Sequence, residues 1–281
     1  MIPADFDYVR VSSVDEALSA LRDGGEDAKL LAGGHSLIPL MKLRVAAPAV
    51  LIDIGGVREL EGIRRDAGGA TVIGALTRHA TVAADESLGL IAKVAKTIAD
   101  QQVRNRGTIG GSIAHGDPAA DLPAALLAAE GSVTVRGSGG TREIPASELF
   151  VDYMTTAIGP DEVLTEVRIP SMDGWRSSYQ KFNRRQEDWA MVAVCVMLRT
   201  AADGTCDAVR IGLTNMASTP LRATAAEELL RGRPLTAETI ALAADQADNG
   251  TEPPEDLNAS SDYKRHLARV LCRRALEEAA H

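Results

Sequence analysis

The sequence predicts an α+β protein of two domains. Its 281 residues suffice for two domains of ordinary size, and an apolar content of 45% can supply a core for each. The turn-forming run Pro170–Gly174 marks the expected boundary, because the composition changes across it. Beyond it, strand-like segments precede helical ones, an order typical of a strand meander packed by helices. We therefore divide the chain into residues 1–171 and 172–281.

A capping box opens the first predicted helix. Glu16 follows Ser13 by three residues, so the hydroxyl can accept a helical N–H while the carboxylate returns to the Ser13 N–H. This helix is expected to stop at Gly24. Apolar residues at spacings of three and four predict one long helical segment over 81–99, and Asp121 is placed to be the N-cap of the next helix. Short apolar and β-branched runs predict strands at 29–32, 50–54, 132–136, 142–145 and 163–169, and a hairpin within 63–75.

The second region is predicted to form a three-stranded antiparallel sheet with helices. Strands are expected at 179–182, 191–198 and 208–213, and helices at 224–231, 236–248 and 262–279. Residues 191–198 are apolar throughout, which is typical of a strand buried on both faces.

Composition argues against several classes of partner. The net charge is −9 and the basic residues are scattered, which disfavours nucleic acid. No apolar run reaches the length of a membrane span, and the first residues lack the pattern of a signal peptide, so we expect a cytoplasmic protein. Cys195, Cys206 and Cys272 are too few and too far apart for a disulfide framework, a zinc site or an iron–sulfur cluster. Cys195 is expected to be a buried apolar residue, and any metal cluster to lie on another chain.

Two glycine-rich stretches are the main candidates for a binding site. Leu31–Leu37 reads LAGGHSL, and Gly107–Ser112 reads GTIGGS. Glycines let backbone N–H groups approach an anion closely, and a helix beginning at Ser36 would add the positive end of its dipole. We expect the second stretch to be a loop held between two helices. Together the stretches would clamp a pyrophosphate from opposite sides.

A purely structural role is the alternative, because glycine is the usual turn residue. The familiar nucleotide motifs G-x-G-x-x-G and G-x-x-x-x-G-K-[ST] are missing from the sequence. Neither the G-x-S-x-G elbow nor H-E-x-x-H is present, which argues against a standard hydrolase. Anion binding by the paired stretches is the hypothesis that remains.

Several motifs also carry a resemblance to a known family. They are LAGGHSLIPLMK at 31–42, IGALT at 73–77, GTIGGS at 107–112, DPAADLP at 117–123 and IGLTN at 211–215. As a set they resemble the FAD-binding medium subunits of the molybdenum hydroxylases, in the xanthine oxidase family, and most of all the carbon monoxide dehydrogenase subgroup. The resemblance implies an FAD-binding domain of the PCMH or vanillyl-alcohol-oxidase type, built from two α+β subdomains, and a smaller C-terminal α+β domain, with the FAD in the cleft.

The same resemblance implies a set of residues that hold FAD without a covalent bond. Those expected at the pyrophosphate are Leu31, Ala32, Gly33, Gly34, His35, Ser36, Leu37, Gly107, Thr108, Ile109, Gly110, Gly111 and Ser112. Thr77 and Asp121 are expected at the phosphate or ribityl region, Leu164 near the ring system, Lys181 close to the flavin and Trp189 against the isoalloxazine, and Ala75 and Ala120 complete the set. No residue of this chain is assigned a catalytic or metal-binding role.

Some of these residues have ordinary structural alternatives. Lys181 is equally well read as a solvated strand residue, Trp189 as a core residue, and Asp121 as a helix cap. His35 lies where some flavin oxidases attach FAD covalently, but the medium subunits resembled here bind it noncovalently. His115 with Asp117 and Asp121 can be drawn as a metal site, although we favour hydrogen bonding within a turn, because Asp117 precedes a proline.

The resemblance implies electron transfer rather than substrate oxidation on this chain. A large subunit with the molybdenum cofactor would oxidise the substrate, and a small subunit with [2Fe-2S] clusters would pass electrons to FAD here. The final acceptor would be a quinone, oxygen or a nicotinamide, and the complex a dimer of heterotrimers. Carbon monoxide dehydrogenase and the nicotine, purine, quinoline and aldehyde hydroxylases all remain open as the holoenzyme.

Two other functions stay open. A stand-alone flavin oxidase would need a substrate pocket and a base in the C-terminal domain, where His266 is the candidate and a surface role is favoured. A non-catalytic scaffold would use its glycines only for turns and would have no affinity for FAD.

Overall fold

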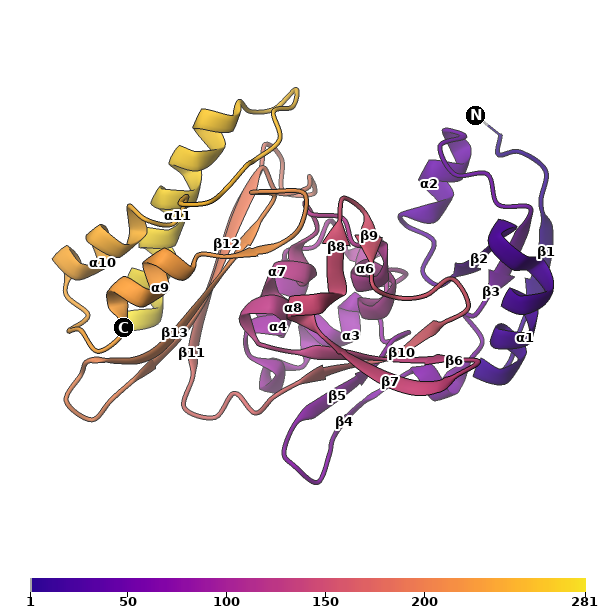
Figure 1. Ribbon diagram of the computed structural model, residues 1–281, viewed down its shortest axis with the longest axis horizontal. Helices are drawn as coiled ribbons and strands as arrows, with labels where there is room; N and C mark the ends of the chain where they lie inside the picture. The colour runs from indigo at the N-terminus through magenta and orange to yellow at the C-terminus, as the bar shows by residue number, and fades with distance from the viewer. Residues whose placement is uncertain (1) are drawn as a thin grey trace.

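The computed structural model describes residues 2–281, which form three lobes in a row (Figure 1). We call residues 2–60 the N-terminal lobe, 61–169 the middle lobe and 176–281 the C-terminal lobe. Figure 1 places the N-terminal lobe at the right and the C-terminal lobe at the left. No helix within residues 2–281 combines the length and apolar character needed to cross a membrane.

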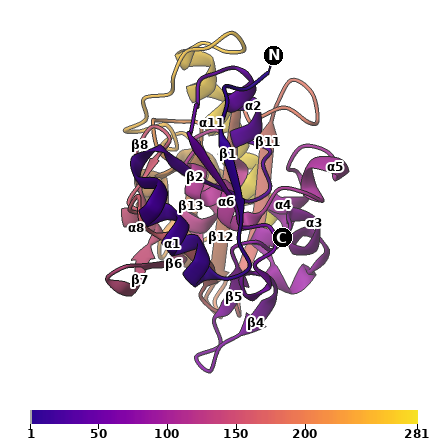
Figure 2. The same cartoon turned by 90° about the vertical axis from the view of Figure 1, so that its right-hand side faces the viewer.

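The N-terminal lobe is a small parallel sheet with helices. Its strands β1 (Asp7–Arg10), β2 (Ala28–Leu31) and β3 (Val50–Asp53) pair in the order β1-β3-β2. Helix α1 (Val14–Gly24) lies beside them (Figure 2), and α2 (Leu37–Lys42) follows β2. The Ser13 hydroxyl accepts the Glu16 N–H at 3.2 Å, as predicted. The Glu16 carboxylate instead binds the N–H and hydroxyl of Ser12, so only half of the capping box forms.

The middle lobe is a five-stranded antiparallel sheet covered by short helices. Its strands are β4 (Ile63–Arg65), β5 (Thr71–Gly74), β10 (Val163–Ile169), β6 (Ser132–Gly137) and β7 (Gly140–Pro145), in that spatial order. The helices are α3 (His79–Ala84), α4 (Leu90–Lys96), α5 (Gln101–Arg104), α6 (Ile109–His115), α7 (Asp121–Ala128) and α8 (Ala146–Leu149). A two-stranded hairpin of β8 (Phe150–Asp152) and β9 (Thr155–Thr156) completes this lobe.

The predicted long helix over 81–99 is wrong, because the chain breaks into α3 and α4. The Asp85 carboxylate accepts the Ser87 N–H at 3.1 Å and ends the first helix in a tight turn. Gly89 then takes a positive φ of 52°, which a helix cannot continue through. Apolar residues of both helices still join the core of the middle lobe.

The C-terminal lobe is a four-stranded antiparallel sheet backed by three helices. Its strands are β11 (Arg176–Phe182), β12 (Val192–Thr200), β13 (Cys206–Thr214) and β14 (Leu221–Arg222), and its helices are α9 (Thr224–Leu230), α10 (Ala237–Ala244) and α11 (Ser261–Ala280). The predicted three-stranded sheet therefore lacked β14, a strand too short to leave a periodic signal.

Strand β12 is buried on both faces, as predicted. Val194 and Val196 belong to the core formed with α9, α10 and α11. Cys195 and Met197, on the opposite face, belong to the core of the middle lobe, where α7 packs against β12 and β13. The C-terminal lobe is thus joined to the middle lobe through one face of its sheet.

Candidate functional site

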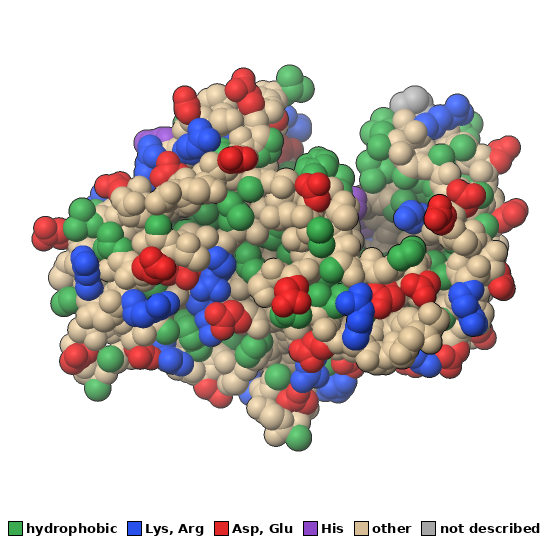
Figure 3. All heavy atoms as spheres, in the orientation of Figure 1, with side chains coloured by type: hydrophobic (Ala, Val, Ile, Leu, Met, Phe, Trp, Pro, Cys, Tyr) green, Lys and Arg blue, Asp and Glu red, His purple; other side chains and the backbone are tan. Residues whose placement is uncertain are grey.

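The two glycine-rich stretches lie against each other, although about seventy residues separate them in sequence. A Cβ added at Gly33 would lie 2.8 Å from the Gly107 Cα and would also collide with the Arg106 carbonyl. Only a glycine allows this approach of two backbones. We call residues 31–37 and 107–112 the glycine seam. Figure 3 shows the surface hollowed between the N-terminal and middle lobes, the lobes that contribute its two halves.

The second half of the seam is a helix and not the predicted loop. Thr108 is the N-cap of α6, and its hydroxyl accepts the Gly111 N–H at 3.1 Å. Gly110 is buried, and its N–H donates to the Ala75 carbonyl at 2.9 Å. A Cβ added at Gly110 would lie 2.6 Å from the Ala75 Cβ. Gly110 is therefore a core residue that lets α6 begin in contact with the end of β5.

The first half of the seam offers backbone N–H groups. The structure confirms Ser36 as the N-cap of α2, and its hydroxyl makes no capping hydrogen bond. Gly34 has a φ of +79° and accepts the Ile38 N–H at 3.0 Å. Within residues 2–281, the N–H groups of residues 33–37 donate to no protein acceptor. A helix start with free N–H groups is suited to bind an anion.

Strands β5 and β10 hold the second half of the seam in place. The Ile109 N–H donates to the Thr77 carbonyl at 3.0 Å, and the Ala75 N–H donates to the Thr165 carbonyl at 2.9 Å. Leu164, next to Thr165, is buried in the core of the middle lobe. The Thr77 hydroxyl bonds both the N–H and the carbonyl of Gly62, at 3.0 and 3.1 Å, so it is committed within the chain.

His79 contacts the glycine seam, although sequence reasoning did not single it out. It is 4% exposed at the start of α3, and its N–H donates to the Gly107 carbonyl at 3.0 Å. Burial lowers the pKa of its imidazole to about 4, with smaller contributions from His35, Arg104 and Arg78. The ring is therefore neutral at pH 7. The only sequence signal was its place two residues after the IGALT motif.

Asp121 does not cap its helix, which corrects the prediction. Ala120 is the N-cap of α7, with no side-chain capping bond, and Asp121 is the first helical residue. Its buried carboxylate accepts the Tyr179 hydroxyl at 2.5 Å and the Lys181 ammonium at 3.0 Å. Burial raises the pKa of Asp121, against the opposing effect of Lys181, and raises the pKa of Tyr179 well above 10.0.

Lys181 is buried, so its reading as a solvated strand residue is wrong. Its side chain is 6% exposed, and its ammonium also donates to the Thr97 carbonyl at 3.2 Å. The pair with Asp121 joins α7 of the middle lobe to β11 of the C-terminal lobe. The ammonium therefore holds two lobes together, whatever else it contacts.

Trp189 is not a core residue. It is 55% exposed in the connection between β11 and β12. The adjacent Asp188 pairs with Arg185 at 3.2 Å, which lowers the pKa of that carboxyl. His35 and His266 are exposed as well.

The proposed metal site at His115 does not assemble. Asp117 accepts the Ala119 N–H at 2.8 Å, the turn role that we favoured, and Asp121 is turned toward Lys181. Within residues 2–281 no group of three or more His, Cys, Asp or Glu side chains is placed to hold a metal ion. The cysteines are all buried, and burial raises the thiol pKa values of Cys195 and Cys272 to about 12.

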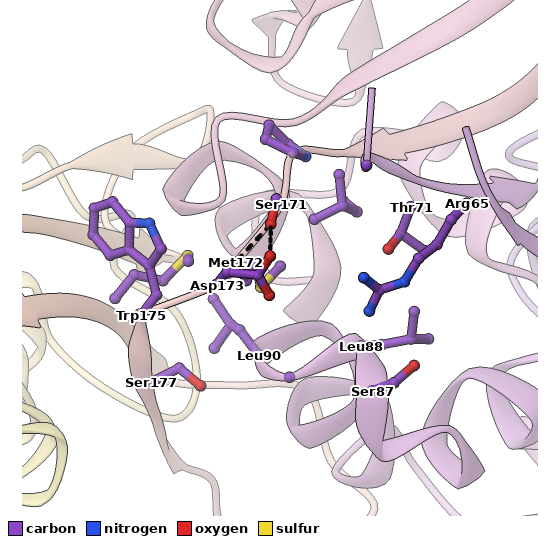
Figure 4. A pocket seen from close by; sticks show the side chains of 15 residues that line it. Arg65, Thr71, Ser87, Leu88, Leu90, Ser171, Met172, Asp173, Trp175 and Ser177 are labelled. Carbon is purple, nitrogen blue, oxygen red and sulfur yellow. Dashed lines mark hydrogen bonds between the residues drawn. The ribbon is translucent and has the colours of Figure 1, made fainter. Parts of the chain in front are cut away.

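Two cavities lie at the junction of the middle and C-terminal lobes, away from the seam. The first, of about 150 Å³, includes Arg65, Leu90, Ser171 and Trp175 in its wall (Figure 4). The second, of about 380 Å³, has Trp175 in its wall with several arginines. The Arg210 guanidinium lies 4.3 Å from the Trp175 ring centre, a cation–π contact. No predicted site residue lines either cavity.

Comparisons with known proteins cover both parts of the chain. Residues 4–172 match the family "FAD binding domain in molybdopterin dehydrogenase", and residues 177–279 match "CO dehydrogenase flavoprotein C-terminal domain". The carbon monoxide dehydrogenase medium chain of Hydrogenophaga pseudoflava is 44% identical over 99% of this chain and 98% of its own. Subunit alpha of the 6-hydroxypseudooxynicotine dehydrogenase complex of Paenarthrobacter nicotinovorans is 39% identical, over 100% of this chain and 96% of its own.

A solved structure agrees with these relatives. A chain of carbon monoxide dehydrogenase from H. pseudoflava, in a form lacking the Mo-pyranopterin moiety of its cofactor, superposes with a TM-score of 0.96. It is 45% identical, and the match covers 99% of this chain and 98% of that one. The expected fold and family are thus confirmed: the chain belongs to the FAD-binding medium subunits of the molybdenum hydroxylases.

Proposed function

We propose that this chain binds FAD at the glycine seam and transfers electrons as the flavoprotein subunit of a molybdenum hydroxylase. The observation that carries the proposal is the seam itself. Gly33 and Gly107 meet without room for a side chain, beside the free N–H groups of residues 33–37. Such N–H groups favour a pyrophosphate, because each charge-assisted hydrogen bond contributes about 1.5–3 kcal/mol. Bound FAD would supply the redox chemistry of the subunit.

The predicted site residues would then have different roles. The seam residues, including His35, Ser36 and Ser112, would hold the pyrophosphate. Ala75, Thr77, Ala120 and Leu164 would shape the wall beside it, mainly through backbone and packing, because the Thr77 hydroxyl is committed to Gly62.

The C-terminal lobe would approach the flavin through Lys181 and Trp189. We propose that the Lys181–Asp121 pair fixes that lobe beside the cofactor, since its charges are buried between α7 and β11. Trp189 is exposed and free to contact the isoalloxazine ring. We keep the domain division at 1–171 and 172–281.

We propose that the FAD is held noncovalently. The family resembled by the sequence binds it in this way, and the free N–H groups around His35 supply recognition without a bond to its ring. Covalent attachment at His35 is the alternative, and acid precipitation of the loaded protein separates the two.

We propose that the electron donor is a partner subunit, because the relatives of this chain are medium or alpha subunits of larger dehydrogenases. We propose a small subunit with [2Fe-2S] clusters and a large subunit with the molybdenum cofactor, assembled as a dimer of heterotrimers in the cytoplasm. The relatives of 44% and 39% identity serve different dehydrogenases, so carbon monoxide is one candidate substrate among several. The acceptor would be a quinone, oxygen or a nicotinamide.

A titration of the purified chain with FAD tests the site. Ser36→Asp places a carboxylate among the free N–H groups, where its negative charge opposes the charged pyrophosphate. The substitution should weaken FAD binding by about 10-fold or more. Ser36→Ala should bind nearly as the wild type does. Ser147→Asp adds the same charge at an exposed position of α8 and serves as the control. Equal affinity of Ser36→Asp and Ser147→Asp would contradict FAD binding at the seam.

A further inference from the structure

His79 stands out because it is a buried polar residue with an unexplained atom. Its Nδ1 has no hydrogen-bond partner within the described part of the chain. Buried side-chain nitrogens are nearly always paired, so an exception requires a reason. None of the motifs and none of the assigned site residues accounts for it.

The ring lies directly against the glycine seam. A Cβ added at Gly107 would lie 2.6 Å from the His79 Cδ2 and 3.0 Å from its Nε2. The Nε2 edge of the imidazole therefore faces Gly107, which in turn touches Gly33. His79 fills the space that a side chain at position 107 would need.

The start of α3 also holds the backbone of the seam. The His79 N–H bonds the Gly107 carbonyl at 3.0 Å, and the Arg78 guanidinium donates to the Arg106 carbonyl. The Arg106 carbonyl is the group with which a Cβ at Gly33 would collide. Residues 78 and 79 thus hold the carbonyl groups of Arg106 and Gly107, the two residues against which Gly33 packs.

The charge state of the ring decides what it can donate. Burial disfavours a second proton on the ring most strongly, and the neighbouring His35, Arg104 and Arg78 act in the same direction. A neutral imidazole carries one N–H. On Nδ1 this hydrogen would be a buried donor without an acceptor, whereas on Nε2 it faces the seam. Burying an unpaired donor is costly, so the Nε2–H tautomer is favoured.

We propose that His79 is a further residue of the FAD site, whose neutral ring supports Gly107 and directs an Nε2–H toward the pyrophosphate-binding seam. This inference rests on the proposed function. It explains why Nδ1 has no hydrogen-bond partner. With the hydrogen on Nε2, the ring leaves Nδ1 unpaired and presents a donor at the seam. An uncharged donor there adds a hydrogen bond without a buried charge.

Three substitutions separate this role from simple packing. Gln places its amide nitrogen near the position of Nε2, Asn places it near Nδ1, and Leu keeps only the volume. His79→Gln should bind FAD within about 3-fold of the wild type, whereas His79→Asn and His79→Leu should bind about 10-fold more weakly, the effect of one lost hydrogen bond. His266→Leu, at an exposed position of α11, is the control.

The outcomes distinguish the inference from the function on which it rests. Wild-type affinity of His79→Leu, or equal losses of affinity in the Gln, Asn and Leu variants, would overturn the role of Nε2 but would leave the proposed function standing. Failure of the wild type to bind FAD would overturn the proposed function and this inference with it. The melting temperature of each apo-variant shows whether a loss of affinity follows from loss of folding.

A spectroscopic measurement on the wild type keeps the inference testable if the variants do not fold. Nitrogen-15 chemical shifts of histidine distinguish the two neutral tautomers. The His79 signals are recognised because they should not titrate between pH 8 and 5, given a pKa of about 4. We expect the Nε2–H form, with the Nε2 signal moving on addition of FAD. An Nδ1–H form, or an Nε2 signal unchanged by bound FAD, would contradict the proposal.

Discussion

Replacing Lys181 tests the buried ion pair between the lobes. Lys181→Met keeps the aliphatic chain but leaves the Asp121 carboxylate, 4% exposed, without its cation. Removing one partner of a buried pair costs about 3–5 kcal/mol. We expect about 3 kcal/mol at pH 8, because the Tyr179 hydroxyl still donates to Asp121. Lys96→Met, in the exposed pair with Glu86, should change stability little.

The pH dependence of this loss follows from Asp121. Its pKa in the folded protein is already raised above 3.8 by burial, and loss of Lys181 raises it further. A carboxyl with a raised pKa holds its proton more tightly in the folded protein. Its contribution to stability therefore falls as the pH rises from its pKa in the unfolded chain toward its pKa in the folded protein. The loss in Lys181→Met should therefore be smaller at pH 5 than at pH 8.

Denaturant midpoints of the wild type and the variants at both pH values provide the measurement. Adding Asp121→Asn to Lys181→Met removes the uncompensated charge and should restore about 1–3 kcal/mol at pH 8. A Lys181→Met loss no larger than that of Lys96→Met, or one that grows toward acidic pH, would refute the buried pair.

Two further predictions concern the seam. His79 has a pKa lowered from 6.5 to about 4, so the unfolded chain takes up its proton first, and stability is lost as pH falls through this window. At about 1.4 kcal/mol per pH unit, the loss of stability approaches about 3 kcal/mol between pH 7 and 4. Denaturant titrations of His79→Gln should lack this pH-dependent loss. A pH profile of the variant that matches the wild type would contradict the buried neutral ring. Gly33→Ala should destabilise the apo-protein by about 1–3 kcal/mol and weaken FAD binding in the same titration, because its Cβ meets Gly107; a wild-type melting temperature and affinity would show that the two halves are not in contact.

Local signals sufficed for much of the fold. The Ser13 cap, the strand predicted at 132–136 and the two-sided burial of β12 follow from residue patterns, and the structure confirms them. The break between α3 and α4 did not follow, because the apolar period continues across Asp85 and Gly89. The hydrogen bond between Asp85 and the Ser87 N–H and the positive φ of Gly89 override that period, and neither is visible in the apolar pattern.

The site was predicted as a set of residues rather than as a geometry. The two glycine stretches do lie together, but Gly110 serves close packing against Ala75, and a loop and a helix start are alike in sequence. Lys181 was ambiguous because its burial depends on which face of β11 meets α7. It lies opposite Ala193 in the register, on the same face as Tyr179 opposite Cys195, and that face packs on the middle lobe. Such contacts between distant segments leave no local pattern.

An absorption spectrum of the FAD-reconstituted wild-type chain, taken before and after acid precipitation, tests whether this chain binds FAD and whether the bond is noncovalent. After removal of free FAD on a desalting column, we expect the protein to show a flavin spectrum and acid to release all of the flavin into the supernatant. Colour kept in the pellet would contradict noncovalent binding and direct attention to His35. A colourless wild-type protein after reconstitution under any condition would contradict the flavoprotein function itself.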